Sequence, residues 1–287
     1  MSAEWESVII NGNINEIETF INDGFNINSQ NNEKDSPLNV ALINKREIEV
    51  IQLLLKYGAD PNIQNYYYFT SLHHAISKKY NLNTIELLLN HGYIINRKSD
   101  AMASPILYFV LFNKHPDMIK LLELLFKYGV DPNIQSNHGY SLLNYAIFEN
   151  NNIETLELLI NHGANLNVCD SIGNSLLHTA IDKHREINLI KFLINHKIDV
   201  NKQNISGETI LHTILYKTIL DQDVKMGMTR DIQIQINNKV KDIVEVLLKN
   251  GCSTSIHNRN RQTPLDIAKS RNLIDICQLI ESYQLRY

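Results

Sequence analysis

One six-residue phrase recurs along this chain at a nearly constant interval. Most copies begin with Ser or Thr, have Leu or Ile third and end in Ala. They open at Ser36, Thr70, Ser104, Ser141, Ser175, Thr209 and Thr263. The steps between these openings are 34, 34, 37, 34, 34 and 54 residues. Internal repetition at such a period is typical of small units that contact only their neighbours. The 287 residues are therefore predicted to form an elongated stack rather than a compact globule.

The copy that opens at Thr70 shows why each repeat predicts two short helices. The Thr70 hydroxyl stands where the first amide groups of a helix lack partners. Residues 71–76 place their apolar side chains on one helical face, and residues 85–89 predict a second helix. Gly92 follows that helix, where a left-handed residue commonly ends one. Neither helix can bury its apolar face alone, so a neighbouring repeat must cover it.

A second motif recurs in register with the first. Segments 53–62, 124–133 and 158–167 each contain paired leucines or Leu-Phe, a Gly and a closing Asn. The two motifs together resemble ankyrin-repeat proteins, whose unit reads Gly-x-Thr-Pro-Leu-His-x-Ala and then Leu-Leu-Leu-x-x-Gly-Ala-Asp-x-Asn. The resemblance covers nearly the whole chain. It implies an all-α solenoid of about eight helix-turn-helix units, with antiparallel helix pairs stacked side by side and projecting β-turn tips.

We expect a single ankyrin-repeat domain over residues 1–287. Residues 1–28 lack the six-residue phrase and have a polar outer face, which suits an N-terminal cap unit. Residues 29–257 are the expected internal repeats, and residues 258–287 the C-terminal cap unit. The array is expected to end where the chain ends.

Two repeats depart from the pattern. The copy that opens at Ser104 is three residues longer and has Phe109 where the family has a small Ala. Such a bulky residue is expected to push neighbouring helices apart or to need a compensating gap. Between Thr209 and Gly251 the chain carries 20 extra residues, which we place in an inserted loop at about 219–239. Its first half is mostly polar and predicts loop.

Composition excludes several partners. The formal net charge of −4 lacks the basic footprint that nucleic-acid binding needs. No segment reaches the roughly 18 consecutive apolar residues of a membrane helix. The three cysteines are an odd number and lie far apart, which favours a reducing compartment, the cytoplasm.

Nothing in the chain predicts catalysis, a cofactor or a metal site. His73, His178 and His212 occupy the family's His position and are expected to hydrogen-bond between adjacent turns. They lie on separate repeats rather than around one pocket. His73 and His74 point about 100° apart on a helix and cannot easily share an ion. Motifs for phosphate loops or activated nucleophiles are absent from the sequence. We therefore predict that the chain is not an enzyme.

Aromatic residues mark the expected binding surface. The turn before Thr70 contains four in succession, and four more are predicted on the same side of neighbouring repeats. The eight candidates are Tyr66, Tyr67, Tyr68, Phe69, Tyr80, Phe112, Tyr140 and Phe148. Large aromatic side chains dominate the energetics of protein interfaces. The other reading is that several of them pack against adjacent tips and stiffen the array.

The resemblance implies a protein-protein interaction module. We expect a monomer that binds a regulatory protein through its turn tips and concave groove. The stand-alone array and its Asn, Ile and Lys bias resemble ankyrin proteins of poxviruses or of intracellular bacterial effectors, which extends the expected location to a host cytoplasm. The alternative is a substrate-docking or regulatory part of a larger enzyme or ubiquitin-ligase assembly. Self-association through the tip at 66–69 is a third possibility.

Overall fold

A computed structural model describes residues 2–96, 106–136, 138–149, 152–183, 186–223 and 230–285. These residues form sixteen α-helices and contain no strand, which confirms the predicted all-α class. The chain divides into two compact units, the first unit (Met1–Ile134) and the second unit (Gln135–Tyr287), and each is described by itself. The predicted opening at Ser104 lies outside the described residues.

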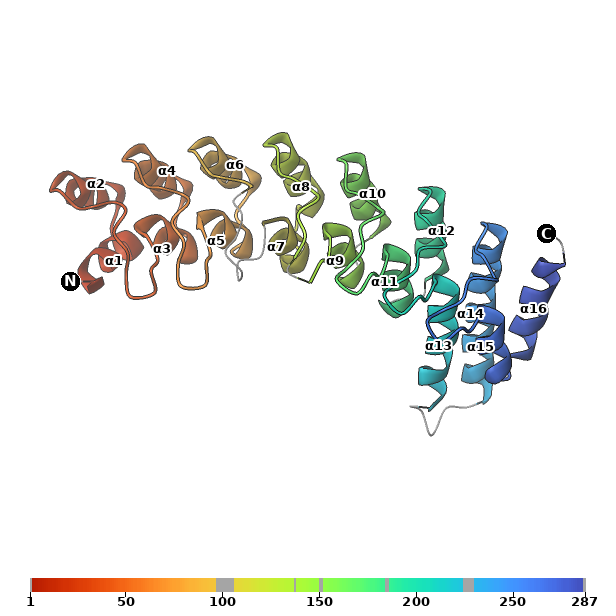
Figure 1. The fold of residues 1–287 in the computed structure, drawn as a ribbon. Coiled ribbons are helices and arrows are strands. Elements are labelled where there is room, and N and C mark those ends of the chain that lie inside the picture. Colours follow the sequence, from red (N-terminus) through yellow and green to blue (C-terminus); the bar gives the residue numbers. More distant parts are fainter. Residues whose placement is uncertain are drawn as a thin grey trace. The chain divides into compact units, whose positions relative to one another are not determined.

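The first unit contains four helix pairs (Figure 1). They are α1 (Ser2–Asn11) with α2 (Ile14–Asn22), α3 (Pro37–Ile43) with α4 (Ile48–Lys56), α5 (Ser71–Ser77) with α6 (Leu82–Asn90), and α7 (Ile106–Asn113) with α8 (Met118–Lys127). The odd-numbered helices contact one another in sequence, and so do the even-numbered helices. The first helix of every pair therefore stacks on the first helix of the next, as the repeat predicts.

The second unit repeats this arrangement with four more pairs. They are α9 (Leu142–Phe148) with α10 (Ile153–Asn161), α11 (Leu176–Lys183) with α12 (Ile187–Asn195), α13 (Ile210–Asp223) with α14 (Arg230–Lys249), and α15 (Pro264–Ser270) with α16 (Ile274–Gln284). Helices α9, α11, α13 and α15 contact one another in sequence. The predicted helix-turn-helix repeat is thus confirmed in both units.

The prediction of a loop at about 219–239 is wrong for most of these residues. Helix α13 runs on to Asp223 and α14 begins at Arg230, so the insertion lengthens two helices that already pack on each other. Residues 224–229 lie outside the described residues. A polar segment without proline satisfies its backbone groups inside a helix as well as in water, and several of its residues, such as Gln, Lys and Arg, are good helix formers. Polarity alone therefore did not distinguish loop from helix here.

In several repeats the recurring phrase forms a reciprocal cap at the start of the first helix. In α9 the Ser141 hydroxyl accepts from the Asn144 amide at 3.3 Å, and the Asn144 side-chain oxygen accepts from the Ser141 amide at 2.9 Å. Thr263 and Asp266 make the same pair of bonds at the start of α15. Each bond satisfies an amide that would otherwise lack a partner. The first and fourth residues of the phrase are therefore fixed by the helix start.

Histidine at the fourth position also reaches the next repeat. His178 Nδ1 accepts from the Ser175 amide at 3.2 Å, and its Nε2 donates to the Glu208 carbonyl at 3.2 Å. His212 makes the equivalent bonds, the second of them to the Gln262 carbonyl at 3.0 Å. The prediction that the histidines of the phrase join adjacent turns is confirmed for His178 and His212, and for His73 it stays a prediction.

Glycine ends the second helix of most repeats. Gly163 has φ +87° and its amide bonds to the Ile160 carbonyl at 2.9 Å. Lys197 takes the same place after α12, with φ +60° and an equivalent bond to the Ile194 carbonyl at 2.8 Å. A side chain with a Cβ is unfavourable in this left-handed conformation. The end of α12 is therefore locally strained.

Replacement of Lys197 by Gly is expected to raise the free energy of unfolding by about 0.5–1 kcal/mol, since relief of the Cβ strain exceeds the extra freedom of the unfolded chain. Urea unfolding followed by circular dichroism measures the change. The reverse substitution, Gly163→Lys, should lower the free energy of unfolding. Equal or lower stability of Lys197→Gly would contradict the assignment of strain.

Acid is expected to destabilise the second unit through its two buried histidines. Burial lowers the pKa of His178 and of His212 below the ordinary value of about 6.5. The unfolded chain therefore binds these protons more readily, and the free energy of unfolding falls as pH drops through about 6.5 toward the lower folded pKa values.

A variant with Asn at both positions, the residue that the chain itself uses at Asn144, should keep the caps and lose part of this pH dependence. Urea midpoints of the wild type and of His178→Asn/His212→Asn at pH 7 and pH 5 measure it. Parallel losses of stability in the two proteins would show that the histidines do not contribute.

Candidate binding surface

The turns between helix pairs are five-residue tips closed by backbone hydrogen bonds. In the first unit the Asn31 amide bonds to the Asp35 carbonyl at 3.1 Å, and the Asn65 amide bonds to the Phe69 carbonyl at 3.0 Å. The tips at 136–140, 170–174, 204–208 and 258–262 in the second unit close in the same way. Neighbouring tips are joined by one further backbone bond, such as that from the Tyr66 amide to the Glu33 carbonyl at 3.0 Å. The predicted projecting turns are thus present and linked.

The fourth residue of each tip adopts a left-handed conformation. Gly139, Gly173 and Gly207 occupy this place in the second unit, and a Cβ there would lie 2.8–3.0 Å from the backbone of the next tip. In the first unit the same place holds Lys34 with φ +60° and Tyr68 with φ +61°. Arg261, with φ +59°, holds the same place in the last tip of the second unit. Glycine therefore occupies the fourth position in the tips at 136–140, 170–174 and 204–208, and a residue with a side chain occupies it in the other three described tips.

The aromatic tip (residues 65–69) presents two tyrosines to solvent. Tyr66 is 56% exposed and Tyr67 is 67% exposed, whereas Tyr68 and Phe69 are half-buried. The Lys34 ammonium lies 4.8 Å from the centroid of the Tyr66 ring, where a cation is attracted to the ring face. The outer half of this tip is therefore an accessible aromatic surface beside a cation.

Phe69 has a different role, because it packs inward. Its ring stacks on His73 with centroids 5.4 Å apart and meets Phe109 edge-on at 5.2 Å. Phe109 also meets His73 edge-on, at 5.1 Å. The bulk of Phe109, expected to disturb the stack, is accommodated by this aromatic cluster. One of the four tip aromatics therefore belongs to the core that joins α5 to α7.

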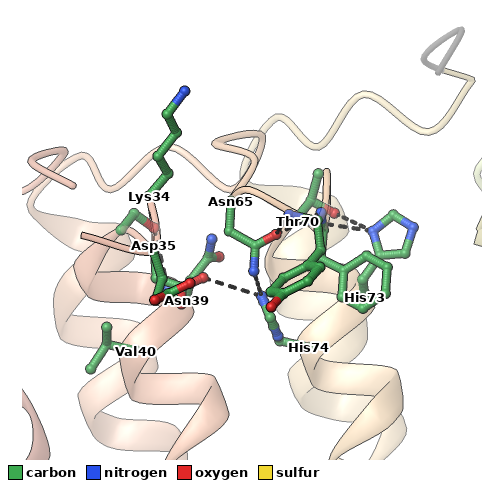
Figure 2. A network of polar contacts seen from close by, with 12 residues as sticks. Lys34, Asp35, Asn39, Val40, Asn65, Thr70, His73 and His74 are labelled. Carbon is green, nitrogen blue, oxygen red and sulfur yellow. Dashed lines mark hydrogen bonds and ion pairs between the residues drawn. The ribbon is translucent and has the colours of Figure 1, made fainter. Parts of the chain in front are cut away.

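A polar network stands behind the aromatic tip (Figure 2). The Asn65 side-chain oxygen accepts from the amides of Tyr67 at 2.9 Å and Phe69 at 3.0 Å. Its Nδ2 lies 3.4 Å from His74 Nε2, and Asp35 Oδ1 lies 3.6 Å from the same nitrogen. Asp35 and His74 are both buried. Their juxtaposition was not predicted; the one sequence signal was a second histidine, His74, inside the phrase.

The remaining four predicted residues separate into distinct surroundings. Tyr80 is half-buried, its hydroxyl donates to the Arg46 carbonyl at 2.9 Å, and burial raises its pKa to about 12. Phe112, at the end of α7, is 68% exposed. Tyr140 and Phe148 belong to the second unit, where they are half-buried and pack edge-on at 5.0 Å. An aromatic strip that runs from the aromatic tip to Phe148 stays a prediction.

The described residues show no grouping suited to metal binding, since no three His, Cys, Asp or Glu side chains among them converge on one point. Within the same residues, every helix is too short or too polar to cross a membrane. The three cysteines are free thiols, and burial raises the pKa of Cys252 to about 12. A thiol with so high a pKa is a poor nucleophile.

Replacement of Phe69 and replacement of Tyr67 are expected to differ in their effect on the free energy of unfolding. Phe69→Ala removes the centre of a cluster and should lower the free energy of unfolding by about 2–3 kcal/mol. Tyr67→Ser removes an exposed ring and should change it by less than about 0.5 kcal/mol. Urea unfolding of the two single variants measures both effects. Similar losses in the two variants would show that Tyr67 also supports the fold.

Comparisons with known proteins agree with this architecture. A family model described as Ankyrin repeats (3 copies) matches residues 7–99, 49–135 and 106–204. The crystal structure of the human ASB11 ankyrin repeat domain is similar, with 18% identity and a TM-score of 0.59 over 74% of this chain and 91% of that chain. The ankyrin repeat domain of Bcl-3, described as a unique member of the IkappaB protein family, matches with 22% identity and a TM-score of 0.46 over 96% of this chain and 97% of that one. No curated protein matches the sequence.

Proposed function

The chain belongs to the ankyrin-repeat family, whose members generally mediate protein-protein interaction, and we propose that it binds a regulatory protein through its aromatic tip. Tyr66 and Tyr67 are the anchors of this surface. The family match over more than half of the chain supports the general role, and the exposed tyrosines support the place.

The observation that carries the proposal is the combination of exposure and rigidity at the aromatic tip. More than half of each tyrosine side chain faces solvent. The backbone that carries them is held by Asn65 and by the bond to the neighbouring tip. Large aromatic side chains gain much from burial at an interface, and a rigid support reduces the entropy lost on binding. Phe112, exposed on α7 of the same unit, supplies a further apolar contact.

The setting that we propose for this interaction is the cytoplasm. Cys169, Cys252 and Cys277 are free thiols, a state that a reducing compartment preserves. The second candidate, self-association through the aromatic tip, uses the same exposed tyrosines and is separated from the first by the test below.

Replacement of both exposed tyrosines is expected to remove the partner and leave the fold intact. Tyr66→Ser/Tyr67→Ser should keep the unfolding temperature of the wild type, because neither ring is buried. The test immobilises the wild type and the variant, exposes both to cytosol and cross-links the proteins that bind. Mass spectrometry then shows which bound proteins depend on the tyrosines.

The matched control uses the same tip positions in the second unit. Ile172 and Ile205 are 49% and 53% exposed, at the third and second places of their tips. Ile172→Ser/Ile205→Ser should therefore keep the proteins that the tyrosine variant loses. If the wild type, the tyrosine variant and the isoleucine variant bind the same proteins, the aromatic tip is refuted as the binding surface. A dimer detected by light scattering in the wild type and absent from the tyrosine variant would favour self-association instead.

A further inference from the structure

Three successive turns of the first unit carry a lysine in the left-handed conformation. Lys45, Lys79 and Lys114 follow α3, α5 and α7 and have φ values of +55°, +57° and +46°. Glycine adopts this conformation without strain, whereas lysine does not. At these three equivalent places the chain therefore has lysine, although the backbone conformation favours glycine.

Side-chain bonds hold the three turns in a row. The Tyr80 hydroxyl donates to the Arg46 carbonyl at 2.9 Å, and His115 Nε2 donates to the Tyr80 carbonyl at 3.0 Å. Each of these residues directly follows one of the lysines. Figure 1 shows α3, α5 and α7 side by side, and stacked helices lie about 8–10 Å apart. The lysine row (Lys45, Lys79 and Lys114) is therefore a regular series of charges with a step of about 10 Å.

The lysine row forms no ion pair with a carboxylate among the described residues. All three lysines are exposed, and the ion pairs in the described part of the chain involve none of them. Glu47, in the first turn, lies 3.2 Å from Arg46. The second turn contains Lys78 and no carboxylate, and the third contains Asp117. The positive charge is therefore greatest around Lys79.

We propose that the lysine row binds an extended acidic segment of a partner protein. A chain in the extended polyproline II conformation rises about 3.1 Å per residue with three residues per turn, so every third side chain lies on one face and three residues span about one step of the row. The segment that fits best has an Asp or Glu at every third position, each opposite one lysine. The chain's net charge of −4 disfavours a nucleic acid, whose closely spaced phosphates need a wider basic surface. This inference rests on the proposed protein-binding function and adds a second surface with its own chemistry.

The helix ends offer a structural explanation for the same lysines. A cation is favourable beside the C-terminal end of a helix, so the lysines would then stabilise α3, α5 and α7. The two explanations predict opposite outcomes for replacement by glycine. If the helix ends need the charges, glycine lowers stability. If the charges serve a ligand, glycine relieves backbone strain and removes only binding.

The test uses Lys45→Gly/Lys79→Gly/Lys114→Gly and a fluorescent nine-residue Gly/Ser peptide with Asp at positions 2, 5 and 8. Fluorescence anisotropy at low salt should show about 10-fold weaker binding for the triple variant, the sum of three exposed ion pairs. Its unfolding temperature should equal or exceed that of the wild type. Among single variants, Lys79→Gly should weaken binding most. A peptide with Asn in place of Asp should bind neither protein.

Lys197→Gly is the matched control, since it makes the same substitution at φ +60° in the second unit and should leave peptide binding unchanged. Equal binding by the wild type and the triple variant would overturn the proposal, as would tighter binding of a single-stranded oligonucleotide than of the acidic peptide. A lower unfolding temperature with unchanged binding would assign the lysines to the helix ends.

The aromatic-tip variant distinguishes this inference from the proposed function. Tyr66→Ser/Tyr67→Ser should bind the acidic peptide as tightly as the wild type. If the lysine row binds the peptide but all tip variants capture the same proteins as the wild type, the aromatic tip is refuted as a binding surface and the lysine row is not. If capture of proteins depends on the tyrosines but the wild type does not bind the peptide, the lysine row is refuted and the aromatic tip is not.

Discussion

One side chain in each of several repeats closes its own helix and also bonds the next repeat, and the stack depends on this double contact. His178 and His212 accept the cap amide through Nδ1 and reach the following tip through Nε2. Asn144 does the same, because its side-chain oxygen accepts from the Ser141 amide and its Nδ2 donates to Thr179 Oγ1 of the next repeat at 2.8 Å. Helices of seven to nine residues are unstable alone. Here the residue that starts a helix is also the residue that secures its neighbour, so local and tertiary structure form together.

The same coupling prepares the first unit for binding. Asn65 closes the aromatic tip and contacts His74, while Phe69 ties the tip to α7 through Phe109. The outer tyrosines thus stand on a support that is fixed before any partner arrives. On the other edge of the same unit, Tyr80 and His115 fix the turns that carry the lysine row. Both proposed surfaces are built from side chains that the packing leaves unused.

Local chemistry explains what could be predicted from the sequence. Caps, helix-ending glycines and apolar faces lie within one repeat, so the helices and the all-α class followed from the phrase. Features that join different repeats were harder to see. Tyr80 was expected at a binding surface, but the carbonyl that accepts its hydroxyl belongs to Arg46, 34 residues earlier. The helical insertion was missed because polarity fits loop and helix alike, and the left-handed lysines were missed because nothing marks lysine as a turn residue.

The residue at the fourth position decides how freely each tip can change. In the second unit, a side chain at Gly139, Gly173 or Gly207 would collide with the backbone of the adjacent tip. Lys34 and Tyr68 in the first unit, and Arg261 in the last tip of the second, already carry side chains there. New contact chemistry can therefore arise at these three tips by single substitutions, whereas the tips at 136–140, 170–174 and 204–208 must keep glycine or separate from the next tip. Divergence in what such arrays recognise should accumulate at the tips that already tolerate bulk.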